Sequence, residues 1–188
     1  MNAQERFRDA QRLFLEGRHK ESINAFTESI EAGVRTDIAL LSRGVAYLKT
    51  EQFEKAIKDF GTVLAINSNN VRAYFYRGIA YMAKNDFEIS IKDFDKTIEL
   101  KPDFGAAFFA RGAAYAQLGN EYEAARNIKT AIIFSERNIQ GLTDTFGLFR
   151  TQFDKAMAIM TDMERTPRVL LTEEEIKKVK KWLADRDH

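Results

Sequence analysis

The chain has 188 residues, 45% of them hydrophobic and 30% charged, which is enough for one ordinary globular domain with a substantial core. Its 29 Lys+Arg and 28 Asp+Glu leave a net charge of +1, which argues against a dedicated nucleic-acid binder, because such proteins need a basic excess to neutralise phosphates. The absence of cysteine excludes disulfides, zinc–thiolate sites and cysteine nucleophiles.

The N-terminal stretch MNAQERFRDAQRLF is charged and amphipathic, without the apolar region of a secretory signal. No run of about 18 apolar residues occurs, so no membrane span is expected. We therefore expect a cytoplasmic protein. The chain has only 2 prolines and no long alternation of valine and threonine, which favours an all-α fold.

A fixed period organises the sequence. RGVAY at 43–47 returns as RGIAY at 77–81 and as RGAAY at 111–115, each time after 34 residues. Four frames align without a gap, at residues 3–36, 37–70, 71–104 and 105–138, and the first frame is the loosest. Apolar residues inside each frame recur at helical spacing, and a polar or glycine-containing break divides each frame near its middle. Each frame is therefore predicted to form a helical hairpin.

The glycine of each RGxAY stretch, Gly44, Gly78 and Gly112, falls in mid-helix, where glycine costs about 0.5–1 kcal/mol relative to alanine. Close approach of the partner helix would explain its recurrence. Such hairpins cannot bury their apolar faces alone, so neighbouring frames are expected to stack.

The pattern resembles the tetratricopeptide repeat family over residues 3–138. The resemblance rests on the three glycines, on Tyr47, Tyr81 and Tyr115, on the small residues Ala56, Ser90 and Ala124, and on Pro102. It implies an all-α, right-handed superhelical solenoid with a concave groove that binds proteins or peptides.

The arginines need partners, because an unpaired buried charge is costly. Sixteen residues after Arg43 stands Asp59, and sixteen after Arg77 stands Asp93. In the fourth frame Arg111 has Asn127 at this distance. We predict contacts inside each hairpin, Arg43–Asp59, Arg77–Asp93 and Arg111–Asn127. The alternative is a basic surface along the groove that grips an acidic peptide.

The resemblance also implies which residues line the groove. The candidate partner-binding residues are Phe7, Gln11, Leu41, Val45, Leu48, Arg72, Phe75, Tyr76, Ile79, Met82, Phe109 and Ala113. Most are apolar, which favours an amphipathic helix or apolar peptide as the ligand, although any one of them could belong to the hairpin core. One subtype of the family captures chaperone C-termini with a charged clamp, and here only Arg72 keeps a clamp charge.

The frame is lost after residue 138. Residues 139–163 are predicted to form a capping helix, 164–171 a loop and 172–188 a short amphipathic helix that carries Ile176, Val179 and Leu183 beside four lysines. This last helix could pack on the cap, enter the groove of its own or a neighbouring chain, or bind an acidic partner or membrane surface.

No catalytic set stands out around His19 and His188, and the sequence contains neither a phosphate-binding glycine loop nor a metal-ligand spacing. We therefore expect no enzymatic activity, no cofactor and no metal. The sequence predicts a protein-interaction scaffold or adaptor. A chaperone that shields an apolar client segment, and a self-assembling protein whose C-terminal helix fills a neighbour's groove, remain alternatives.

Overall fold

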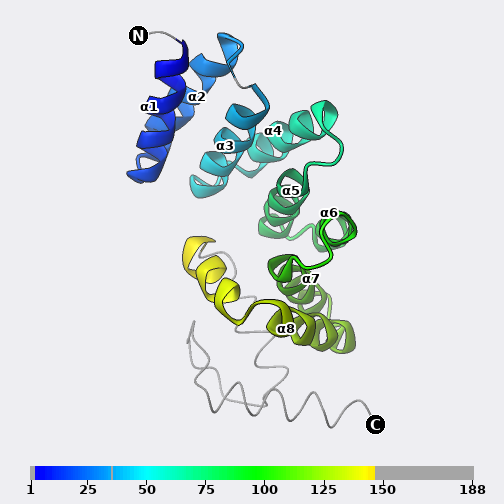
Figure 1. Cartoon of the computed structure of the whole chain (residues 1–188). Coiled ribbons are helices and arrows are strands. Elements are labelled where there is room, and N and C mark those ends of the chain that lie inside the picture. Colours follow the sequence, from blue (N-terminus) through cyan, green and yellow to red (C-terminus); the bar gives the residue numbers. More distant parts are fainter. Residues whose placement is uncertain (1–2, 35, 147–188) are drawn as a thin grey trace. The chain divides into compact units, whose positions relative to one another are not determined.

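The structure is a computed structural model that describes residues 3–34 and 36–146. Within these ranges the chain forms helices and turns and no β-strand. The helices are α1 (Ala3–Leu15), α2 (His19–Glu31), α3 (Thr36–Lys49), α4 (Phe53–Ile66), α5 (Val71–Ala83), α6 (Phe87–Leu100), α7 (Gly105–Gln117) and α8 (Glu121–Phe146). The predicted all-α fold is confirmed (Figure 1).

The chain divides into two compact units, Met1–Asn85 and Asp86–His188. In the first unit α1 packs on α2 and α3 packs on α4, while α2 contacts α3 and α4 contacts α5. In the second unit α7 packs on both α6 and α8. Within each unit, helices therefore contact their neighbours in sequence, as expected for stacked hairpins (Figure 1).

The turn inside each hairpin uses the same backbone conformation at the same place of the repeat. Gly17, Glu51, Asn85 and Gly119, spaced 34 residues apart, all have positive φ, at 77°, 59°, 65° and 75°. Glycine and asparagine tolerate this left-handed region, whereas Glu51 adopts it at a cost. The repeat thus fixes the turn geometry even where its residue type changes.

In the α3–α4 hairpin and the α7–α8 hairpin, a large residue on the second helix packs against a glycine on the first. The side chains of Phe26, Phe60 and Phe94 are fully buried at equivalent positions. A Cβ built on Gly44 would lie 2.5 Å from the Phe60 ring, and one built on Gly112 would lie 3.0 Å from Ile128. Close helix approach is therefore the reason for glycine at these two positions.

The last described helix differs from the expected boundaries. α8 continues from Glu121 to Phe146, so the predicted end of the fourth repeat at residue 138 falls inside a helix. The remainder of the predicted cap, the loop 164–171 and the helix 172–188 lie outside the described residues.

Candidate functional site

Arg43 makes the contact that the sixteen-residue spacing predicts. Its Nε donates to Asp59 Oδ2 and its Nη2 donates to Asp59 Oδ1, both at 2.8 Å. The side chains are 16% and 6% exposed, so this two-bond ion pair lies largely out of water. Hydrogen bonding to Asp59 raises the pKa of Arg43 further above its ordinary value, so the guanidinium stays charged.

Arg111 makes the neutral form of the same contact. Its Nε donates to Asn127 Oδ1 at 2.7 Å, and Asn127 Nδ2 donates to the carbonyl oxygen of Glu123 at 2.8 Å. The amide is thus oriented by its own helix. Arg77 and Asp93 belong to different units, so the third predicted pair stays a prediction.

The same arginines also contact the preceding hairpin, which the sequence reasoning missed. Arg43 Nη1 donates to Thr27 Oγ1 at 2.9 Å, and Arg111 Nη1 pairs with Asp95. Both partners stand sixteen residues before the arginine, so a polar residue at that distance was the available signal. We call each such arginine with its two partners an arginine bridge, since it joins the two helices of one hairpin to the hairpin before it. Its groups are engaged inside the fold, which disfavours a peptide-gripping role for Arg43 and Arg111.

Most of the predicted groove residues are core. Seven of the twelve side chains are buried: Phe7, Leu48, Phe75, Ile79, Met82, Phe109 and Ala113. Phe7, for example, packs edge-on against Phe26, with ring centroids 6.0 Å apart. These seven side chains are covered in the folded chain, which corrects the expectation that they line an open groove. The first helix of a hairpin packs on more than one neighbouring helix, so its apolar side chains are buried against those helices.

The remaining five candidates are accessible and all lie in the first unit. Gln11 on α1 and Arg72 on α5 are exposed, and Leu41 and Val45 on α3 and Tyr76 on α5 are half-buried. α3 contacts both α1 and α5, so the three helices that carry these residues are neighbours. We call these five residues the first-helix surface.

Tyr76 anchors the α5 end of the first-helix surface. Its ring stacks on Phe60 with centroids 5.9 Å apart, and burial raises the pKa of its hydroxyl above the ordinary value, an effect that the nearby Arg72 charge opposes. The surface therefore combines a fixed aromatic ring with an exposed cation.

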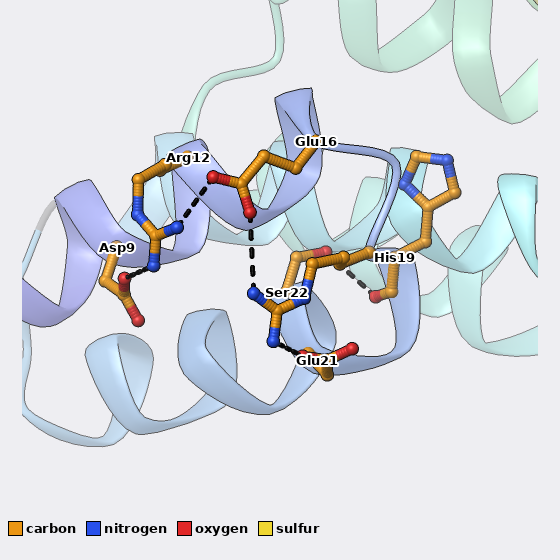
Figure 2. Close-up of polar contacts among 7 residues, drawn as sticks. Asp9, Arg12, Glu16, His19, Glu21 and Ser22 are labelled. Atoms are coloured by element: carbon orange, nitrogen blue, oxygen red, sulfur yellow. Dashed lines mark hydrogen bonds and ion pairs between the residues drawn. The ribbon is translucent and has the colours of Figure 1, made fainter.

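A chain of ion pairs crosses the turn between α1 and α2 (Figure 2). Arg12 pairs with Asp9 and Glu16, and Arg18 pairs with Glu16 and Glu21. All five side chains are at least 30% exposed, so each pair contributes little stability.

His19 lies beside this turn, at the start of α2. Its Nδ1 is buried and has no hydrogen-bond partner in the described part of the chain, and its ring lies 5.1 Å from that of Phe14. Burial, and then the charge of Lys49, lowers the pKa of His19 below its ordinary value of 6.5. The neutral imidazole is therefore the form that the fold prefers.

We expect stability to fall on acidification because of His19. The unfolded chain takes up this proton near pH 6.5, whereas the folded chain takes it up at lower pH. The stabilisation is complete above about pH 6.5 and is lost as the pH falls through the folded-state pKa. Urea unfolding of wild type and of His19→Gln between pH 8 and 5 tests this, and parallel pH profiles would contradict it. His188 is common to both proteins, so its titration cancels.

Residues 3–34 and 36–146 contain no group of three or more histidine or acidic side chains that could hold a metal ion. No helix in this part of the chain is sufficiently long and apolar to cross a membrane.

Comparison with known proteins identifies the repeat. Residues 44–85 match the family model described as "TPR repeat", and residues 71–104 match the one described as "Tetratricopeptide repeat". No curated protein sequence matches the chain.

Solved structures share the fold. A thermophilic tetratricopeptide protein of Thermus thermophilus, TTC0263, has a TM-score of 0.66 at 18% identity, over 97% of this chain and 100% of that one. MamA from Desulfovibrio magneticus RS-1 has a TM-score of 0.69 at 15% identity, and the match covers 99% of this chain and 97% of the MamA chain. The first TPR of Spaghetti (RPAP3), bound to the HSP90 peptide SRMEEVD, has a TM-score of 0.60 at 25% identity. The match covers 62% of this chain and 93% of the Spaghetti chain.

Proposed function

We propose that this chain, a tetratricopeptide repeat protein, is a protein–protein interaction scaffold that binds a peptide on its first-helix surface. The observation that carries the proposal is that the accessible candidates Gln11, Leu41, Val45, Arg72 and Tyr76 lie on three neighbouring helices, since α3 contacts both α1 and α5. The structurally similar Spaghetti repeat domain holds a peptide, which supports a peptide ligand here.

The chemistry of the surface suggests the kind of peptide. Leu41, Val45 and the Tyr76 ring offer partly exposed apolar contacts, and Arg72 offers an exposed guanidinium. A peptide with apolar side chains next to a carboxylate would satisfy both, because Arg pairs well with carboxylates. The surface is small, so we infer a short anchor rather than a long buried helix.

Selection of a random peptide library on the full chain tests the proposal. Enriched peptides should combine apolar and acidic residues. Their affinity, measured by isothermal titration calorimetry, should fall about tenfold with Arg72→Glu and with Val45→Lys, which corresponds to about 1.4 kcal/mol. Lys58→Glu on α4, which alters an exposed lysine outside the first-helix surface, is the matched control.

If the selected peptides bind wild type, Arg72→Glu, Val45→Lys and Lys58→Glu with equal affinity, this placement of the binding site is wrong. A loss with Lys58→Glu as large as with Arg72→Glu would indicate a general charge effect instead. Circular dichroism of each variant separates lost binding from lost folding.

A further inference from the structure

A polar cleft opens between the first hairpin and the second. Its volume is ≈ 570 Å³, within the range of about 300–1,000 Å³ that is typical of ligand sites. One wall is a stripe of α2 made of Lys20, Asn24, Thr27, Glu28 and Glu31. The other wall consists of Tyr47, Gln52 and Lys55, and Ile23 completes the lining. None of the first-helix surface residues lines this polar cleft.

The charges of the cleft are separated along its length. Lys20 lies in the first turn of α2 and Lys55 in the first turn of α4, where the helix dipoles are also positive. Glu28 and Glu31 lie in the last turn of α2, where the dipole is negative. Lys20 and Glu31 are eleven residues apart in sequence, about 16 Å along the helix axis. The cleft therefore has a basic end and an acidic end.

The fold engages only part of this polar lining. Thr27 is held by Arg43, and Lys55 Nζ donates to Gln52 Oε1 at 2.8 Å and lies 5.5 Å from the centre of the Tyr47 ring. Glu28 Oε2 accepts a hydrogen bond from Arg6 Nη1 at 2.9 Å, and the charge of Glu31 acts on Arg43, whose pKa it helps to raise. In the part of the chain that the structure describes, the side chains of Lys20, Asn24 and Glu31 make no hydrogen bond or salt bridge. An ammonium, an amide and a carboxylate are thus left along one stripe of α2.

We propose that this polar cleft binds a short extended peptide segment that carries an acidic and a basic side chain four residues apart. The acidic side chain would lie at the Lys20 and Lys55 end, and the basic one at the Glu31 end. An extended chain advances about 3.3 Å per residue, so four steps span about 13 Å. This is about 3 Å less than the separation along α2, a difference that the long side chains of the peptide's acidic and basic residues can bridge. Asn24, between the two ends, can donate to and accept from a peptide group.

The test uses the full ¹⁵N-labelled chain at low ionic strength and the blocked pentapeptide acetyl-Glu-Ala-Ser-Ala-Lys-amide. Amide resonances of α2 residues 20–31 and of Tyr47, Gln52 and Lys55 should shift saturably, with a dissociation constant in the range of about 1–10 mM. A neutral peptide with Gln at both charged places should bind about fivefold more weakly, as should the charged peptide with Lys20→Glu.

The fourfold exchange Lys20→Glu, Lys55→Glu, Glu28→Lys and Glu31→Lys provides a sharper control. It reverses the charge at both ends of the cleft, so the same pentapeptide should recover its affinity by binding in the opposite direction. Arg72→Glu should leave pentapeptide binding unchanged, which separates this inference from the proposed function of the first-helix surface.

Three results would overturn the proposal. The first is that no resonance shifts saturably up to about 10 mM peptide. The second is that the neutral peptide binds as tightly as the charged one. The third is that the shifted resonances belong to α1 and α5 instead of α2. If the charged peptide binds wild type and the fourfold exchange binds it as weakly as Lys20→Glu alone, recognition by opposite ends of the cleft is wrong.

Discussion

Replacing Asp59 by alanine should destabilise the protein by about 2–3 kcal/mol, measured by urea unfolding at neutral pH. Arg43 would keep its place between two helices, 16% exposed, without the carboxylate that accepts two of its N–H bonds. Removing one partner of a fully buried pair typically costs about 3–5 kcal/mol, and the partial exposure of Arg43 lowers the figure. The hydroxyl of Thr27 would remain as a single neutral acceptor.

Asp59→Asn is the matched control, because the chain already uses this arrangement at Arg111 and Asn127. We expect a cost of about 1 kcal/mol, since the amide oxygen still accepts one hydrogen bond while the charge attraction is lost. If Asp59→Ala costs less than about 0.5 kcal/mol, the arginine bridge does not stabilise the hairpin. If asparagine is as costly as alanine, the neutral bridge cannot replace the ion pair in this hairpin.

Two glycines in neighbouring helices should respond oppositely to alanine. In Gly44→Ala the new Cβ would lie 2.5 Å from Phe60 Cε1 and 2.9 Å from Cζ, and the Phe60 ring is fully buried. Overpacking of this kind costs about 1–3 kcal/mol, which exceeds the helix-propensity gain of up to about 1 kcal/mol. We therefore expect a net loss of stability.

Gly61 lies in the interior of α4, and a Cβ built on it would meet nothing within 4 Å. Gly61→Ala should therefore raise the free energy of unfolding by about 0.5–1 kcal/mol. The two variants are compared by urea unfolding under the same conditions. Combining Gly44→Ala with Phe60→Leu should cost less than the sum of the single changes, since the shorter side chain leaves room for the methyl group. Simple additivity, or a stabilising Gly44→Ala, would contradict the packing explanation.

The difference between Gly44 and Gly61 shows which glycines the sequence could assign to helix packing. Gly44 and Gly112 recur in the 34-residue frame, and the period alone pointed to close helix packing. Gly61 has no counterpart in the other frames, which carry Thr27, Asp95 and Lys129 at its position. Recurrence therefore distinguished a packing glycine from an incidental one.

The groove residues show where the same reasoning failed. Periodicity places Phe75 and Val45 on comparable faces of their helices, yet Phe75 is buried and Val45 is half-buried. Apolar periodicity indicates that one face of a helix is covered, but it does not indicate whether a neighbouring helix or a bound partner covers it. A residue in the core and one in a binding groove give the same sequence signal.

The sequence by itself determined the repeat, the helical hairpins, the packing role of the recurrent glycines and the acid or amide partner of Arg43 and Arg111. These features depend on contacts at one fixed spacing within a hairpin, so they repeat visibly every 34 residues. Only the tertiary structure decided which apolar side chains stay accessible, that Arg43 and Arg111 also reach back to the preceding hairpin, and that a polar cleft opens beside α2. These depend on how separate hairpins stack, because exposure is set by atoms that neighbouring repeats contribute.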